Sequence, residues 1–251
     1  MAGHPLSAAA LHRALARHPG ATAALPWRIA HRSVCASTEL ELERWLAAAA
    51  PPLVVIADRQ RFGHGQQGRP WCSPAGGAWL SAAIPWPASA STSAALGLAV
   101  ALGLALQLEA LGLQPRIKWP NDLLIEGRKL AGLLPRLRWR GAQVRHAQLG
   151  VGLNGWNPVP AGAINLAEAL GRRRHPEARP DRLAARALRG LEWAVAAAQQ
   201  PELVRRQAEQ RLWRPDGFAH QGKRWQVLGL AADGGLRLEH QGALVTLQRH
   251  F

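Results

Sequence analysis

Apolar residues recur along the chain in two periods, and these periods predict alternating helices and strands. Apolar positions spaced three and four residues apart predict helices, whereas short apolar runs bounded by Gly or Pro predict buried strands. The predicted helices cover residues 6–17, 39–49, 91–112, 181–199 and 201–211. The predicted strands cover residues 28–34, 53–57, 78–84, 116–119, 123–125, 128–139 and 144–153. This order predicts an α/β or α+β domain of catalytic size.

The end of the chain has a different pattern. From residue 224 to residue 251, short alternations of apolar and polar positions are broken by Asp233-Gly234-Gly235 and Gln241-Gly242, which are turn signals. The pattern predicts a small module of β-strands. We place the boundary after residue 212, which divides the chain into domains 1–212 and 213–251.

Composition narrows the class of protein. Apolar residues make up 48% of the chain and charged residues 19%, which supports a buried core and excludes general disorder. The formal net charge of +15 favours an anionic partner such as nucleic acid, a phosphate ligand or an acidic protein. Two cysteines, Cys35 and Cys72, are too few for a disulfide scaffold or a cysteine-based metal site. The N-terminal segment has no apolar run long enough to span a bilayer and lacks the layout of a signal peptide. We therefore expect a cytoplasmic protein with no membrane partner.

Lysine is rare among the basic residues. The chain has 31 Lys and Arg residues, but its lysines are Lys118, Lys129 and Lys223 alone. Where Arg is the default cation, a lysine either marks a site that needs a compact ammonium group or survives by chance. Composition does not decide between these readings.

A glycine-rich loop follows the predicted strand at residues 53–57. Gly63, Gly65 and Gly68 allow backbone N–H groups to approach an anion closely. A dinucleotide-binding turn would lead directly into a helix, whereas Pro70 and Trp71 follow here, so the Rossmann interpretation fails. The alternative is a flexible surface loop.

Two further segments carry polar groups suited to an anionic substrate. Residues 118–122 read Lys-Trp-Pro-Asn-Asp, and the tight turn at Glu126-Gly127 folds Lys129 back towards Lys118 and Asp122. Residues 150–154 read Gly-Val-Gly-Leu-Asn, in which the glycines allow close backbone contact and the amide can bond to a heteroaromatic ring. Taken singly, each segment is equally typical of an ordinary turn or strand end.

Taken together, these segments resemble the biotin protein ligase family over roughly residues 30–155. The resemblance is carried by Gln60 with Gly63-x-Gly65-x-x-Gly68-Arg69-x-Trp71, by Lys118-Trp119-Pro120-Asn121-Asp122, by Gly127-Arg128-Lys129-Leu130-Ala131-Gly132-Leu133-Leu134 and by Gly150-x-Gly152-x-Asn154. The Lys-Trp-Pro-Asn-Asp element is the specific part. The resemblance implies an α+β fold, in which helices flank a central mixed β-sheet and a small SH3-like β-barrel domain follows at the C-terminus.

The resemblance also implies an activity. Members of the family activate biotin with ATP as biotinyl-5′-AMP, with Mg²⁺, and transfer it to a lysine of the biotin carboxyl carrier protein of acetyl-CoA carboxylase. About 27 residues precede the first predicted strand, so we expect a monofunctional bacterial ligase that has no DNA-binding domain and no DNA partner. Monomer and homodimer both remain open. The alternatives are a lipoate ligase of the same fold and, less favoured because the basic residues are dispersed, a nucleic-acid-binding protein.

The resemblance assigns site residues in three groups. The catalytic group is Lys129, Lys118 and Asp122. The biotin-binding group is Ser37, Thr38, Glu39, Gln60, Gly63, His64, Gly65, Gln66 and Lys129. The group that binds ATP and the adenylate is Gly65, Gly68, Arg69, Trp71, Asn121, Gly132 and Asn154.

Four positions depart from the family's pattern. His64 and Gln66 stand where the family loop has arginines, and Glu39 stands where Asn is usual. Pro135-Arg136 stands where the family often has a residue followed by Glu. The two changes in the loop predict a looser hold on the adenylate.

Overall fold

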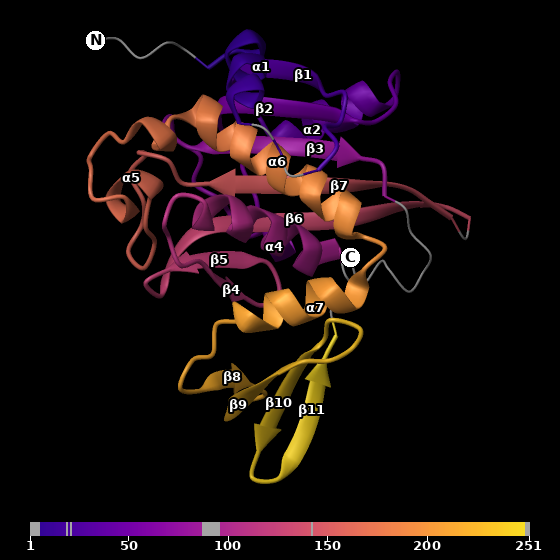
Figure 1. Cartoon of the computed structure of the whole chain (residues 1–251), viewed down its shortest axis with the longest axis vertical. Coiled ribbons are helices and arrows are strands. Elements are labelled where there is room, and N and C mark those ends of the chain that lie inside the picture. The colour runs from indigo at the N-terminus through magenta and orange to yellow at the C-terminus, as the bar shows by residue number, and fades with distance from the viewer. Residues whose placement is uncertain (1–5, 19, 21, 87–95, 142, 249–251) are drawn as a thin grey trace.

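A seven-stranded mixed β-sheet forms the centre of the molecule (Figure 1). The computed structural model describes residues 6–18, 20, 22–86, 96–141 and 143–248. The strands of this sheet are β1 (Arg28–Cys35), β2 (Leu53–Gln60), β3 (Ala78–Ile84), β4 (Arg116–Lys118), β5 (Asp122–Ile125), β6 (Arg128–Arg140) and β7 (Gln143–Leu153). Their order across the sheet is β1-β2-β3-β7-β6-β5-β4, with β1 and β2 parallel and the other neighbours antiparallel.

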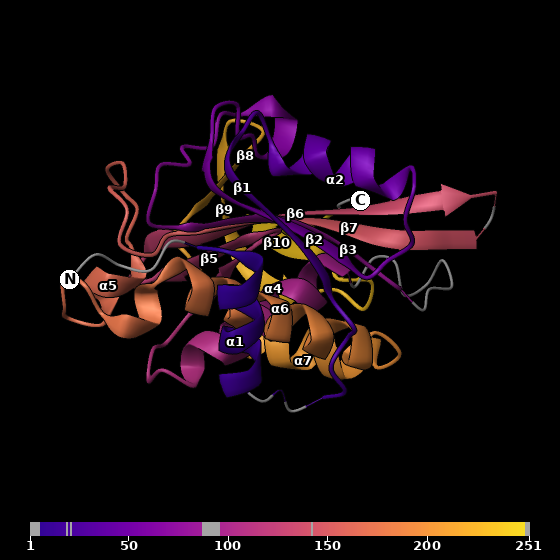
Figure 2. The same cartoon turned by 90° about the horizontal axis from the view of Figure 1, so that it is seen from above.

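Helices cover both faces of the sheet. They are α1 (Ala8–Arg17), α2 (Thr38–Leu46), α4 (Leu96–Glu109), α5 (Leu166–Ala169), α6 (Pro180–Ala197) and α7 (Pro201–Gln210), with single 3₁₀ turns at Gln66–Gly68 and Pro176–Ala178. Seen from above, α1, α4, α6 and α7 lie on one side of the sheet and α2 lies on the other (Figure 2). The predicted α+β architecture, with helices flanking a mixed sheet, is confirmed.

The larger core lies between the sheet and the helices α1, α4 and α6. Helix α4 is apolar on all sides, and most of its residues are buried, which is typical of a central helix. It crosses α6 where Gly103 meets Gly190, and a Cβ at either position would collide with the backbone of the other helix. On the opposite face, α2 packs Leu42 on Leu53 and Val55 of β2.

The predicted elements agree with the structure apart from their ends. Strand β2 runs three residues beyond the predicted end at Ala57, to Gln60, and α2 ends at Leu46 instead of residue 49. The predicted start of the helix at 91–112 lies outside the described residues. Helix α5 was not predicted, because it is a single turn begun by the Asn165 side chain, which accepts a hydrogen bond from the Glu168 N–H.

Two local features place functional side chains. The Ser37 side chain caps α2 by accepting a hydrogen bond from the Glu39 N–H, which puts the first turn of α2 beside the end of β2. The turn between β5 and β6 has positive φ at Glu126 (51°) and Gly127 (74°), as a two-residue hairpin turn requires. This turn carries Lys129 back alongside β5.

The C-terminal segment forms a second, four-stranded antiparallel sheet. Its strands are β8 (Phe218–His220), β9 (Lys223–Leu230), β10 (Leu236–His240) and β11 (Ala243–Leu247), in the order β11-β10-β9-β8. Strand pairing begins at residue 218, ahead of the predicted 224. In the described residues the sheet stays open between β8 and β11, so a small β domain is present but the predicted barrel is not closed.

The turn between β9 and β10 contacts the Lys-Trp-Pro-Asn-Asp element, because the Trp119 Nε1–H donates to the Gly234 carbonyl at 3.1 Å. Between α7 and β8, the Trp213 N–H donates to the carbonyl of Ile117 in β4 at 2.8 Å. In the part of the chain that is described, none of the helices is long and apolar enough to cross a membrane.

Candidate active site

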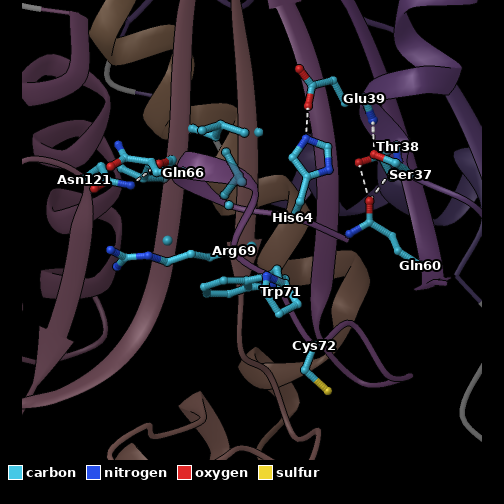
Figure 3. A pocket seen from close by; sticks show the side chains of 18 of the residues that line it. Ser37, Thr38, Glu39, Gln60, His64, Gln66, Arg69, Trp71, Cys72 and Asn121 are labelled. Atoms are coloured by element: carbon cyan, nitrogen blue, oxygen red, sulfur yellow. Dashed lines mark hydrogen bonds and ion pairs between the residues drawn. The ribbon is translucent and has the colours of Figure 1, made fainter. Parts of the chain in front are cut away.

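A cavity of about 370 Å³ opens on the sheet face that carries α2 (Figure 3). Its walls are the start of α2, the loop after β2, and the facing parts of β3, β6 and β7. Every residue assigned to the site from the sequence lines this cavity except Gly63, Gly68, Lys118 and Asn154. Segments that are far apart in the sequence therefore meet at one place.

One wall is a hydrogen-bonded network of neutral side chains. The Gln60 Oε1 accepts from the Thr38 N–H at 2.8 Å and from the Thr38 hydroxyl at 2.9 Å. The Thr38 and Ser81 hydroxyls lie 2.8 Å apart, and the Gln60 Nε2–H donates to the Ser73 hydroxyl at 2.9 Å. Because Ser37, Thr38 and Ser81 are buried, this wall offers oriented donors and acceptors with little water to compete.

The opposite part of the cavity holds an ion pair under an indole ring. The Lys129 Nζ lies 2.7 Å from the Asp122 Oδ1 and 4.9 Å from the centre of the Trp71 ring. The predicted approach of Lys129 to Asp122 is confirmed. A flexible ammonium group held in this way is placed to neutralise an anion that enters the cavity.

Trp71 rests on two glycines of neighbouring strands. Gly132 of β6 and Gly152 of β7 are cross-strand partners, and a Cβ on them would come within 2.8 Å and 2.5 Å of the Trp71 ring. The close contact predicted at Gly152 is made by the Trp71 ring. The Trp71 Nε1 is buried without a hydrogen-bond partner among the described residues.

The loop between β2 and β3 folds into a small hairpin, residues 63–71. The Gly65 N–H donates to the Arg69 carbonyl and the Trp71 N–H donates to the Gly63 carbonyl, each at 2.8 Å. Gln67 has φ of 56° and Gly68 has φ of 69°, which turns the chain at the tip. The predicted glycine-rich loop is thus ordered, and it carries His64, Gln66 and Arg69 into the cavity lining.

A charged cluster joins this hairpin to α2 and β6. The Glu39 Oε2 lies 2.8 Å from the His64 Nε2, and the Glu39 Oε1 accepts from an Arg136 Nη1–H at 2.5 Å. The contact between Glu39 and His64 is visible in Figure 3. Of these three residues, Glu39 and His64 line the cavity.

Two assigned residues are used elsewhere in the structure. Lys118 is the cross-strand partner of Asp122, but its Nζ lies 5.4 Å from the centre of the Trp213 ring and does not reach the cavity lining. The Asn154 side chain is 95% buried and donates to the Ile164 carbonyl at 3.2 Å while accepting from Asn157. The expected contact between Asn154 and a ligand would require these bonds to change.

Sequence reasoning missed Ser81 and Ser73 as members of the site. Ser81 is the single polar residue of β3, whose residues are all buried, and such a residue needs a hydrogen-bond partner. That isolated hydroxyl in an apolar strand is a signal that the sequence does contain. Ser73 carries no comparable signal, because it lies in an irregular segment.

The two cysteines differ in their surroundings. Burial raises the pKa of the Cys35 thiol, and the nearby Glu41 carboxylate raises it further, so this thiol stays protonated at neutral pH. Cys72 is exposed and lines the cavity. Among the described residues, no group of three or more His, Cys, Asp and Glu side chains could hold a metal ion.

The arrangement suits a ligand that has several chemical parts. The neutral wall can bond to an amide-like ring, the Lys129 ammonium can hold an anion, and the half-buried Trp71 ring can stack on an aromatic base. The hairpin can cover such a ligand from one side.

Comparisons with known proteins agree with this geometry. Residues 33–154 match the biotin/lipoate A/B protein ligase family. The chain is 35% identical over 103 residues to the bifunctional ligase/repressor BirA of Bacillus subtilis, covering 40% of this chain and 32% of that protein. It is 35% identical over 128 residues to the biotin–[acetyl-CoA-carboxylase] ligase of Paracoccus denitrificans, covering 44% and 47%. The chain therefore spans less than half the length of these curated relatives.

Solved structures share the fold. The biotin protein ligase from Aquifex aeolicus in complex with biotin and ATP aligns with a TM-score of 0.71 and 20% identity, covering 88% of this chain and 96% of that one. The biotin protein ligase from Leishmania major in complex with biotinyl-5-AMP aligns with a TM-score of 0.62 and 20% identity, covering 90% and 100%. At this identity the likeness establishes the architecture alone.

Proposed function

We propose that the chain is an ATP-dependent biotin ligase, because residues 33–154 match the biotin/lipoate A/B protein ligase family. It activates biotin as biotinyl-5′-AMP and transfers the biotinyl group to a lysine of a biotin carboxyl carrier protein. The observation that carries the proposal is the pairing, in one cavity, of the neutral wall around Thr38 and Gln60 with the Lys129–Asp122 ion pair. We further propose that residues 1–212 form the catalytic domain and residues 213–251 a small β domain.

The neutral wall fits the ureido ring of biotin. That ring has a carbonyl and two N–H groups, which match the hydroxyls and the amide of Ser37, Thr38 and Gln60. The Thr38 and Gln60 side chains are already bonded to one another, so little side-chain freedom is lost on binding. Glu39, His64, Gly65 and Gln66 complete the biotin pocket on the hairpin side.

The charged part of the cavity serves the first chemical step. A biotin carboxylate oxygen attacks the α-phosphorus of ATP, an oxygen–phosphorus bond forms, and pyrophosphate leaves. Two anions must approach each other, so a cation between them lowers the barrier. Lys129 supplies that cation, and Asp122 orients it from 2.7 Å. Lys118 contributes positive charge from outside the cavity.

Trp71 and the hairpin bind the nucleotide. The indole stacks on adenine, with Gly132, Asn121 and Asn154 on the side of the strands. The backbone N–H groups of the hairpin and the Arg69 guanidinium hold the phosphate. By covering the mixed anhydride, the hairpin excludes water until the acceptor amine arrives.

Transfer completes the cycle. The uncharged ε-amine of the carrier lysine attacks the acyl carbon of the adenylate, an amide bond forms, AMP leaves and the amine loses a proton. Asp122 lines the cavity and would hold Mg²⁺ together with the ATP phosphates, since Mg²⁺ is usually bound by substrate phosphates and one or two carboxylates. The ion would neutralise negative charge on the phosphates. We propose that the reaction takes place in the cytoplasm, with the carrier of acetyl-CoA carboxylase as acceptor.

The test is biotin-dependent exchange of labelled pyrophosphate into ATP, with lipoate assayed in parallel. Exchange with biotin and not with lipoate is expected. Exchange with lipoate alone would assign the chain to lipoate ligation. The absence of exchange with either acid, together with steeply salt-dependent binding to DNA, would support the nucleic-acid alternative. Thr38→Val, which removes the hydroxyl and keeps the shape, should weaken biotin and leave ATP affinity unchanged.

A further inference from the structure

Glu39 joins parts of three elements at the mouth of the cavity. It lies in the first turn of α2, it pairs with His64 of the 63–71 hairpin at 2.8 Å, and it accepts a hydrogen bond from Arg136 of β6. The Glu39 side chain is only 15% exposed, while those of His64 and Arg136 are 33% and 41% exposed. A carboxylate in this partly buried position is engaged through both of its oxygens.

Backbone hydrogen bonds hold the two strands of the hairpin together and join the segment just before it to the end of β1. Within it, the Gly65 N–H bonds to the Arg69 carbonyl, and at its base the Arg61 N–H donates to the Cys35 carbonyl at 2.9 Å. Near its tip, the Arg69 side chain donates to Gln67, a partner within the same hairpin. The His64 side chain instead contacts Glu39, a residue outside the hairpin, at 2.8 Å. This contact therefore fastens the first strand of the hairpin to α2.

Arg136 sets the direction of the Glu39 carboxylate. A guanidinium binds one carboxylate oxygen in a defined geometry, which leaves the other oxygen directed at His64. Arg136 also offsets the cost of keeping a charged carboxylate partly out of water. Glu39 and Arg136 thus form an anchor on α2 and β6, and His64 is its partner on the hairpin.

We propose that Glu39 is a positioning residue, which holds the 63–71 hairpin over the cavity through its contact with His64. This inference rests on the proposed function for its consequence, which is slower loss of the bound adenylate. The contact itself joins residues of this chain alone. Removing the pair opens the hairpin more often and speeds release of ligand.

The test measures amide hydrogen exchange across residues 62–71 in the ligand-free protein. Glu39→Gln and His64→Ala should each speed exchange of the Gly65 and Trp71 amides about tenfold, which corresponds to ~1.4 kcal/mol of opening free energy. The double variant should exchange no faster than either single variant, because both changes remove one contact.

Glu43→Gln is the matched control. Glu43 lies one turn further along α2 and pairs at 2.7 Å with Arg138, which, like Arg136, lies on β6. Among the described residues it forms no hydrogen bond or ion pair with the hairpin. Exchange at residues 62–71 should be unchanged in this variant. Unchanged exchange in both Glu39→Gln and His64→Ala would overturn the proposal, as would additive effects in the double variant.

A second measurement connects the hairpin to the ligand. The off-rate of biotinyl-5′-AMP, formed on the protein from biotin and ATP, should rise about tenfold in Glu39→Gln, in step with the exchange data. If Glu39→Gln speeds amide exchange but neither the variant nor the natural protein forms bound adenylate, the ligase proposal is refuted and the role of Glu39 in holding the hairpin stands. An unchanged off-rate beside faster exchange would refute the role of the anchor in retention.

Discussion

The Trp71 ring packs against Gly132 and Gly152, and this packing can be tested for its effect on nucleotide affinity. Gly152→Ala adds one methyl group to β7. Its Cβ would lie 2.5 Å from atoms of the Trp71 ring, about 1 Å closer than the ~3.5 Å at which carbon atoms attract. The strand is held on both sides by β3 and β6, so the indole must move.

The size of the effect follows from what the ring contributes. Stacking of an aromatic side chain on a base is worth ~1–3 kcal/mol, which corresponds to roughly 5- to 150-fold in affinity. Displacing the ring by about 1 Å should forfeit much of that, since its contacts with the base fall off steeply with distance. Biotin affinity should change little, because the neutral wall around Thr38 and Gln60 lies on other elements.

The assay is calorimetric titration of each variant with a nonhydrolysable ATP analogue and, separately, with biotin. Trp71→Ala should weaken the analogue more than biotin. Gly152→Ala should do the same, and Gly152→Ala combined with Trp71→Ala should be no weaker than Trp71→Ala alone. Thermal unfolding of each variant checks that the sheet is intact.

Three results would refute this reasoning. Unchanged affinity of Gly152→Ala for the analogue would show that nucleotide binding does not depend on the contact between Trp71 and Gly152. A further loss from Gly152→Ala in the Trp71→Ala background would show that the methyl group acts on the ligand or on the sheet and not through the indole. Equal losses for biotin and the analogue would indicate a collapsed loop.

Three further predictions concern charge. Lys129→Arg should lose most of the pyrophosphate exchange activity, because a planar guanidinium cannot replace a compact ammonium 2.7 Å from Asp122, and activity within about threefold of the natural protein would contradict this. Gln66→Arg should slow release of biotinyl-5′-AMP and reduce stray biotinylation of added albumin, since charged donors form stronger bonds to phosphate than an amide does. An unchanged off-rate would mean that other groups hold the phosphate. Burial, with Arg145 and Arg138 adding to it, lowers the pKa of His146, so the unfolded chain binds a proton more readily and stability falls as the pH drops below the reference value of ~6.5. His146→Leu should therefore show a smaller drop in unfolding free energy between pH 7 and pH 5, measured with urea, and an equal drop would exclude this role.

Much of the site follows from local features of the sequence. The turn at Glu126-Gly127 requires positive φ, and a two-residue hairpin necessarily returns Lys129 along β5 towards Asp122. The Ser37 cap likewise sets the start of α2. Turn chemistry, capping and apolar periodicity act over a few residues, so they can be read without the fold, and the order of helices and strands was predicted correctly for the same reason.

The tertiary structure decided which side chains share the cavity. Trp71 meets Gly132 and Gly152 only because β3, β7 and β6 are neighbours in a definite register. Lys118 lies near Asp122 in the sequence, yet its side chain lies over Trp213, a residue supplied by the end of the chain. Sequence proximity alone could not show that.

The residues that differ from the pattern of the biotin protein ligase family also come together only in the folded protein. Glu39, His64 and Arg136 look like three separate changes along the chain, but in the folded protein they form one charged cluster. Such a cluster depends on strand order and helix placement, which the whole core determines together, whereas each residue's local neighbours in sequence carry no information about its distant partners.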